Sequence, residues 1–405
     1  MISRNEAVDR LRAAAWVKKA DFQRIFTILD GKGGRTRAVG GIVRDTIIGK
    51  PDIGADLDLA SELLPEEVMK RVREAGMSCY PTGIEHGTVT VRNGTATAEI
   101  TTLRRDIKTD GRHAQVLFGT DWRADAKRRD FTINALYASM NGELYDPLDG
   151  LKDLVAKHVR FIGDPDQRIK EDRLRVLRFF RFSASHANEV YDPAGLAACK
   201  RAAGSLDVLS RERVGAEMLK IMALQQAAAT MAMMSEIGAL ELGRKTIKEL
   251  SDYERLTPSP LALARLAILF EAMEQKKLQE KWRLSNALVK EASEIGQAAK
   301  LILAEDFNQL AYRFFRLGFA ALPVAGAIAG WDEERLHAVM EVLHNLKAPP
   351  FPISGRDLLD AGFKPGPELG DALRLVEGEW VNSGFKLERQ ELLGRLESLW
   401  RDKLQ

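Results

Sequence analysis

The spacing of apolar residues changes near residue 150 and divides the chain into two parts. Before that point, short β-type runs alternate with helical patterns and turn signals, which is typical of a small mixed α/β domain. From Leu151 to Gln405 the apolar residues recur at helical spacing, in runs rich in Ala, Leu, Glu, Lys and Arg. The pattern therefore predicts an α+β protein with a small mixed sheet first and an all-helical remainder after it.

A glycine pair stands between a predicted strand and a predicted helix in RAVGGIVRDTIIG, Arg37 to Gly49. Glycines at such a turn let backbone N–H groups approach a phosphate closely, and the positive end of the helix dipole favours an anion there. Arg44 would lie in the first turn of that helix and face the same anion. A plain strand-to-helix turn is the alternative interpretation.

Three acidic residues are predicted on neighbouring strands. Asp56 and Asp58 are two apart in DIGADLDLAS, so their side chains point the same way while Leu57 and Leu59 point into the core. Glu99 lies on the outer face of a second strand, after the hairpin signal Asn93-Gly94. Carboxylates arranged in this way suit two Mg²⁺ ions of a phosphoryl or nucleotidyl transfer site, although exposed acidic residues on half-buried strands are the alternative.

The segment RRDFTINALYAS, Arg128 to Ser139, predicts a helix on which Asp130 and Asn134 share one face. Arg128 and Arg129 at the start of that helix oppose its dipole, which suggests that a triphosphate or an RNA backbone lies nearby.

A second predicted helix, RIKEDRLRVLRFFRFSA from Arg168 to Ala184, is apolar almost all round and is therefore expected to be buried. Its charged residues Glu171, Arg175 and Arg178 lie on one side, with Asp172 beyond them. Buried charges are costly unless they are paired, so this stripe is either an internal ladder of ion pairs or a recognition surface.

Five motifs in this order resemble the class II nucleotidyltransferases, specifically the CCA-adding enzymes. They are GGIVRD with DLDLAS, RRDFTINAL, DPLDGLKDL, EDRLRVLR and RERVGAEMLK. The resemblance covers residues 37–220, and 353–370 is similar to the family's C-terminal region. It implies a polymerase-β-type nucleotidyltransferase head in residues 1–150, a helical neck with a base-recognition helix in 151–220, and a tRNA-binding body and tail in 221–405.

The resemblance also implies a role for individual residues. Asp56 and Asp58 would be the metal ligands, and Glu99, by its predicted place on the neighbouring strand, could join them in the catalytic set as a bridging or supporting ligand. Nucleotide contacts would come from the head and from the base-reading helix, namely Gly41, Arg44, Arg129, Asp172, Arg175, Arg178 and Arg181. An Asp acceptor beside an Arg donor matches the Watson–Crick edges of cytosine and adenine and meets like groups on uracil and guanine. The expected activity is template-independent transfer of CMP and AMP from CTP and ATP to the 3′ end of tRNA.

Other functions stay open at this point. A bacterial poly(A) polymerase of the same superfamily shares the head motifs but differs in substrate and in a head signature that is not found in this sequence, and a partial CC- or A-adding enzyme is a further alternative. A catalytically inactive RNA-binding protein is disfavoured by the complete set of three carboxylates. A fused phosphohydrolase is disfavoured because none of the six histidines stands next to an aspartate.

Charge and composition fit an RNA partner within the cell. The formal net charge is only +2, but eight basic residues against four acidic ones lie within 104–129, and six against two within 168–181. The longest weakly polar stretch, 317–331, is too short for a membrane span, and the N-terminus lacks the apolar core of a secretory signal, so a cytoplasmic protein without membrane contact is expected. Cys79 and Cys199 are predicted to be buried thiols.

Overall fold

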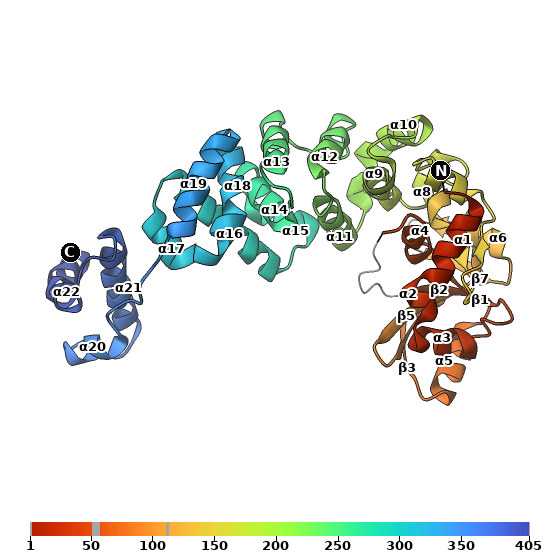
Figure 1. The fold of residues 1–405 in the computed structure, drawn as a ribbon, viewed down its shortest axis with the longest axis horizontal. Helices are drawn as coiled ribbons and strands as arrows, with labels where there is room; N and C mark the ends of the chain where they lie inside the picture. Colours follow the sequence, from red (N-terminus) through yellow and green to blue (C-terminus); the bar gives the residue numbers. More distant parts are fainter. Residues whose placement is uncertain (1, 51–56, 111–112, 405) are drawn as a thin grey trace. The chain divides into compact units, whose positions relative to one another are not determined.

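The structure, a computed structural model, describes residues 2–50, 57–110 and 113–404. It forms two compact units, one comprising Met1–Glu217 with Met233–Glu241 and the other Met218–Ala232 with Leu242–Gln405. All of the described strands lie in the N-terminal part of the first unit, and the described chain from residue 150 onward contains only helices and their connections (Figure 1). The predicted α+β class, a mixed sheet followed by helices, is confirmed.

Seven strands form one sheet in the order β3-β4-β5-β2-β1-β8-β9, in which only the β2–β5 pair is parallel among the described pairs. Its strands are β1 (Thr36–Val39), β2 (Leu57–Ser61), β3 (Ser78–Gly83), β4 (Thr88–Asn93), β5 (Ala96–Thr102), β8 (Tyr137–Ala138) and β9 (Leu144–Tyr145). A separate two-stranded sheet pairs β6 (Arg104–Asp110) with β7 (His113–Phe118).

The predicted hairpin is confirmed and joins β4 to β5. Asn93 pairs with Ala96, so the two turn residues are Gly94 and Thr95, and Gly94 has a positive φ of 57° that favours glycine. Along β5 the odd-numbered residues from Thr97 to Thr101 face outward at least in part, while Ala98 and Ile100 are buried. The alternation predicted for Glu99 is therefore present.

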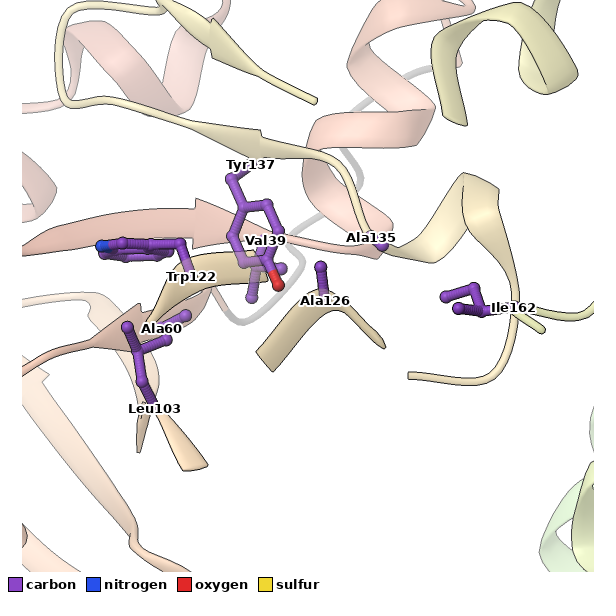
Figure 2. Packing of buried hydrophobic residues seen from close by; sticks show 8 residues of the cluster. All are labelled: Val39, Ala60, Leu103, Trp122, Ala126, Ala135, Tyr137 and Ile162. Atoms are coloured by element: carbon purple, nitrogen blue, oxygen red, sulfur yellow. The ribbon is translucent and has the colours of Figure 1, made fainter. Parts of the chain in front are cut away.

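Helices of the first unit surround this sheet and lead away from it. They are α1 (Arg4–Ala13), α2 (Ala15–Lys18), α3 (Ala20–Ile28), α4 (Gly41–Ile47), α5 (Pro65–Glu74), η1 (Ile84–His86), α6 (Trp122–Lys127), η2 (Thr132–Asn134), α7 (Gly150–Val155), α8 (Pro165–Glu171), α9 (Leu174–Ala187), α10 (Pro193–Ala202) and η3 (Ala203–Val208). Two further helices, α11 (Arg211–Met222) and α12 (Ala227–Glu236), belong to this unit only in part, because the unit boundary falls within each of them. Figure 2 shows one buried cluster of this unit, in which the Trp122 and Tyr137 rings meet edge to face at 5.4 Å beside Val39 of β1. This packing holds α6 against the strands that lead into the candidate site.

The structure differs from two of the predicted helices. The segment 168–184 is not one helix, because α8 ends at Glu171 and α9 begins at Leu174, with Asp172 extended at φ −151°. The Asp172 carboxylate accepts a hydrogen bond from the Leu174 backbone N–H at 3.1 Å, which stabilises the break. The buried apolar face predicted for the second part is confirmed in α9.

The segment 128–139 is not a helix either. Phe131 is extended, residues 132–134 form only the short turn η2, and Tyr137 begins strand β8. Pairing of β8 with β1 and a hydrogen bond from the Phe131 N–H to the Asp130 carboxylate at 2.8 Å replace the helical hydrogen bonds. The predicted contact nevertheless forms, since Asn134 donates to Asp130 at 3.0 Å.

The described part of the second unit consists of helices and the loops that connect them. Besides the segments of α11 and α12 within its bounds, the helices are α13 (Arg244–Leu256), α14 (Ala262–Ala272), α15 (Gln275–Trp282), α16 (Asn286–Leu303), α17 (Phe307–Phe314), η4 (Phe315–Leu317), α18 (Gly318–Ala329), α19 (Glu333–Asn345), α20 (Gly355–Asp360), α21 (Pro367–Asn382) and α22 (Arg389–Leu404). Its C-terminal part has an aromatic core around Trp380, which is 2% exposed. No helix within residues 2–50, 57–110 and 113–404 has the length and hydropathy to cross a membrane.

The two cysteines differ in their surroundings. Cys199 is fully buried, and this burial raises the pKa of its thiol above the ordinary range, whereas Cys79 is only half-buried. The expectation of a buried thiol is thus confirmed for Cys199 and wrong for Cys79, which lies in β3 at the end of the sheet order.

Candidate active site

The glycine pair forms the turn between β1 and α4. Gly40 has φ 72° and ψ −123°, a conformation that side-chain-bearing residues avoid, and Gly41 is the first residue of α4. The guanidinium of Arg44 folds back over this turn, because its Nη2 lies 3.8 Å from the position that a Cβ on Gly41 would occupy. Gly41 and Arg44 therefore lie together at the helix N-terminus, as the sequence pattern predicts.

Arg44 is buried and has several partners. Its Nε and Nη2 donate to the two carboxylate oxygens of Asp45 at 2.9 Å each, and its Nη1 donates to the side-chain oxygen of Asn134. The guanidinium also lies over the ring of Phe182 at 5.0 Å. The group is thus oriented by contacts from three separate segments of the first unit.

Two of the three predicted carboxylates are neighbours on the sheet. Asp58 of β2 is directly opposite Glu99 of β5 in the parallel register, and both residues are exposed, while Leu57 and Leu59 are buried. Neighbouring strands are about 4.8 Å apart, so the two side chains leave the same face of the sheet side by side. The third residue, Asp56, lies outside the described residues.

The carboxylate pair fits a hard divalent cation, which prefers oxygen ligands. Among the residues that the structure describes, no group of three or more His, Cys, Asp or Glu side chains is arranged to hold a metal ion. The predicted set includes Asp56, two residues before Asp58, so the described chain contains only part of that set.

Arg128 and Arg129 have a partner that the sequence reasoning missed. The Asp125 carboxylate, 1% exposed, accepts from Arg128 at 2.7 Å and from Arg129 at 3.1 Å, and Tyr137 donates its hydroxyl to it at 2.9 Å. Burial alone would raise the pKa of Asp125, but the two guanidiniums lower it overall, so the group stays ionised. The sequence did contain a signal for these ion pairs, because Arg128 and Arg129 follow Asp125 by three and four residues, the spacing of neighbours on a helical turn.

At the break between α8 and α9, one ion pair of the predicted ladder forms, between Glu171 and Arg175, whereas Asp172 pairs with a residue outside the stripe. Asp172 accepts from Arg213 of α11 at 2.7 Å rather than from Arg175. Arg175 instead contacts Glu171 at 2.7 Å and donates to the backbone oxygens of Arg168 and Arg128. Asp172 is only half-buried and Arg213 is exposed, with 28% and 44% of their side chains accessible.

Further along α9, two arginines meet two buried carboxylates. Arg178 lies 2.6 Å from the Asp130 carboxylate and 3.7 Å from that of Glu217, and Arg181 donates to Glu217 at 2.7 Å. Burial would lower the pKa of Arg178, but the nearby Asp130 carboxylate raises it overall. These ion pairs fix the direction of both guanidiniums.

A single aromatic ring lies at the centre of three cations. The guanidiniums of Arg44, Arg178 and Arg181 lie 5.0, 5.2 and 4.2 Å from the ring centroid of Phe182, which is 4% exposed. Phe182 follows Arg178 by four residues, which places the two side chains on the same side of α9. Each of these guanidiniums also pairs with a carboxylate, from Asp45, Asp130 or Glu217, so an anionic ligand would compete with those carboxylates for its N–H donors.

Family comparisons agree with this arrangement. A family model described as the poly A polymerase head domain matches residues 36–160, and one described as a probable RNA and SrmB-binding site of polymerase A matches residues 192–242. The sheet, the glycine turn and the carboxylate pair all lie within the first match. The fold and the site thus define a nucleotidyltransferase.

Relatives that span nearly the whole chain narrow the class. CCA tRNA nucleotidyltransferase 1, mitochondrial, from Mus musculus is 32% identical over 93% of this chain and 92% of its own. The CCA-adding enzyme of Lacticaseibacillus paracasei is 31% identical over 95% and 98%. The chain belongs to the CCA-adding enzymes, the CCA tRNA nucleotidyltransferases.

Solved structures agree with this membership. The crystal structure of the Bacillus stearothermophilus CCA-adding enzyme in complex with CTP matches with a TM-score of 0.73 and 26% identity, over 95% of this chain and 99% of that one. The Thermotoga maritima CCA-adding enzyme complexed with tRNA has a TM-score of 0.65 at 17% identity, over 96% and 98%, and it supports the fold alone.

Proposed function

We propose that this protein transfers CMP and AMP from CTP and ATP to the 3′ end of tRNA, without a nucleic-acid template, and so builds or repairs the CCA terminus. The observation that carries the proposal is the match along 93% of the chain to an enzyme named for this activity. The structural neighbours include complexes with CTP, with tRNA, and with a primer tRNA plus an ATP analogue. Residues 1–150 would hold the catalytic head, 151–220 the neck, and 221–405 the tRNA-binding body and tail.

Within the head, Asp56 and Asp58 would hold the divalent metal and Glu99 would support them. The adjacency of Asp58 and Glu99 on one face of the sheet supports this assignment. Nucleotidyltransferases of this superfamily generally depend on divalent metals, and we propose two Mg²⁺ ions. Such ions, when bound, neutralise charge on the attacking and leaving oxygens of the transfer.

The nucleotide would lie against the N-terminus of α4, where Gly41 leaves the backbone open and Arg44 provides positive charge. Arg129 would add a second cation, held in place by Asp125 and Tyr137. Both arginines are oriented by hydrogen bonds before any ligand arrives, which reduces the entropy lost on binding.

Asp172, Arg175, Arg178 and Arg181 would read the base. Asp172 and Arg178 have the more exposed side chains, 28% and 30%, against 12% for Arg175 and 16% for Arg181. Arg175 uses three of its five N–H groups in hydrogen bonds to Arg168, Glu171 and Arg128, so donation to a ring nitrogen would not require it to release them. A base that presents the wrong groups leaves two buried polar groups unpaired at about 1–3 kcal/mol each, which rejects it by a factor on the order of 10² to 10⁴.

The test is nucleotide transfer to a tRNA that ends at the discriminator base, compared between the wild type and Asp58→Asn. The wild type should add C from CTP alone and complete the terminus when ATP is also present. Asp58→Asn should fold normally and lose at least 10² to 10³ in rate, because one source of transition-state charge stabilisation is removed. The exposed Asp166→Asn is a matched control that should stay active. Near-normal transfer by the Asp58 variant would contradict the metal assignment.

We also propose a cytoplasmic location. The bacterial relatives are named simply as CCA-adding enzymes, whereas the mouse, human and zebrafish relatives are named mitochondrial. Fractionation of the source cells with an antibody against the chain would distinguish the two compartments.

A further inference from the structure

His186 lies near the end of α9, outside the five sequence motifs, and makes a polar contact with a residue of the first motif. Its side chain is 4% exposed, and its Nε2 lies 3.0 Å from the Oδ1 of Asp45 on α4. Its Nδ1 lies 2.6 Å from the hydroxyl oxygen of Ser185. The residues in contact, His186 and Asp45, are 141 positions apart in the chain.

The surroundings assign one protonation state to this imidazole. Burial lowers the pKa of His186 to about 4, so the ring is neutral at pH 7 and carries a single proton. Because a carboxylate can only accept, that proton is on Nε2 and is donated to Asp45. The Ser185 hydroxyl can then donate to Nδ1.

The Asp45 carboxylate is hydrogen-bonded to both His186 and Arg44 and so connects them. Its Oδ1 receives hydrogen bonds from both the imidazole and the Arg44 Nε, and its Oδ2 receives one from the Arg44 Nη2. The carboxylate is 34% exposed, so without His186 the Asp45 carboxylate and the Arg44 guanidinium that it holds could move together toward solvent. His186 therefore restricts the side-chain rotamer of Asp45, which in turn restricts the guanidinium of Arg44.

The contact closes a circuit of hydrogen bonds between α9 and the head. From Arg44 the chain of contacts continues through Asn134 to Asp130 and then to Arg178, which is on α9 eight residues before His186. Helix α9 thus holds α4 at two points about two turns apart. Because both ends of this chain of hydrogen bonds lie on α9, it fixes the position of the Arg44 guanidinium relative to that of Arg178.

We propose that His186 is a positioning residue for nucleotide binding, which acts through Asp45 to hold Arg44 in register with Arg178. The proposal rests on the proposed function, in which Arg44 contacts the nucleotide. His186 itself touches no substrate in this scheme. The contact belongs to this chain's own residues and requires no ligand to form.

The test compares His186→Ala, which removes the donor, with His186→Gln, whose side-chain amide can still donate to Asp45. His186 and Ser185 line a cavity of about 500 Å³, so the smaller side chain adds space to an existing cavity. We expect His186→Ala to raise the KM for both CTP and ATP on the order of 10-fold with an unchanged KM for tRNA, because a positioning contact is lost. His186→Gln should recover to within about threefold of wild type.

His158→Ala is the matched control. His158 lies 3.0 Å from the Asp192 carboxylate in the same unit and, within the described part of the chain, makes no polar contact with the circuit, so its loss should leave both nucleotide KM values unchanged. If His186→Ala also leaves them unchanged, or if a folded His186→Gln fails to recover, the positioning role is overturned. Thermal unfolding of each variant shows which of them are folded.

A double-mutant cycle separates this proposal from the function on which it rests. In an Arg44→Ala background, adding His186→Ala should change the nucleotide KM less than twofold, because the group that it positions is already gone. An equal loss in both backgrounds would overturn the positioning role. If Arg44→Ala alone leaves nucleotide binding unchanged, the nucleotide contact of the proposed function is the part that fails.

Discussion

Replacing Asp172 with alanine separates base reading from the stability of the neck. Had Asp172 neutralised buried arginines, its loss would cost about 3–5 kcal/mol. In the structure it pairs instead with Arg213, and both side chains are partly exposed, at 28% and 44%. The substitution should therefore change selectivity without unfolding the protein.

The magnitude follows from the two contacts that are lost. A partly exposed ion pair with Arg213 contributes at most about 1 kcal/mol. The hydrogen bond from the Leu174 N–H to the Asp172 carboxylate, at 3.1 Å, contributes about 1 kcal/mol more. The free energy of unfolding should thus fall by about 1–2 kcal/mol. Discrimination against UTP and GTP should weaken on the order of 10- to 100-fold, because one of two mismatched groups is removed.

The assay combines urea unfolding with single-nucleotide incorporation of CTP, ATP, UTP and GTP. Asp166→Ala is the matched control, because Asp166 also pairs with an arginine, Arg201, but lies on the exposed surface of α8. The control should keep its base selectivity. An Asp172→Ala protein that is destabilised by 3–5 kcal/mol with unchanged selectivity would refute the base-reading role.

Three further predictions concern the surroundings of the nucleotide. Asp125→Ala should lower the free energy of unfolding by about 3–5 kcal/mol, because its carboxylate is 1% exposed and pairs with two arginines, and urea unfolding should show at most about 1 kcal/mol for Asp166→Ala. Gly40→Ala should cost about 1–2 kcal/mol by the same assay, since its φ of 72° strains any side chain, and wild-type stability would contradict the turn geometry. Stability should fall by up to about 3 kcal/mol as pH decreases from 6.5 toward 4, because the unfolded chain takes up a proton on His186 before the folded protein does. His186→Gln should lack this component when unfolding is compared at pH 7 and 4.5.

Local patterns in the sequence predicted the parts of the site that neighbouring residues determine. Alternation along β2 placed Asp58 outward between two buried leucines, and the glycine pair marked the turn before α4. The apolar face of α9 was also predicted, because its spacing is a property of the helix itself. The register that places Glu99 beside Asp58 depends on β5 joining β2, and the strand faces alone could not specify it.

The missed features depend on contacts between distant residues. Glu217, which holds Arg181, is 36 positions away, and Asp45 is 141 positions from His186. The break at Asp172 was missed because the apolar spacing also fits a continuous helix, whereas the extended conformation is stabilised by the hydrogen bond that the Leu174 N–H donates to the Asp172 carboxylate. Strand pairing of Tyr137 with β1 likewise overrode a local helical pattern.

The most direct test of the account is the sequence that the protein writes on a tRNA ending at the discriminator base. The tRNA is incubated with all four nucleoside triphosphates and Mg²⁺ until extension stops, and the 3′ ends are sequenced. The account predicts that C, C and A are added in this order, without U or G and without extension beyond the A. A run of A residues, an arrest after C alone, A alone on the unextended tRNA, or no extension would contradict it.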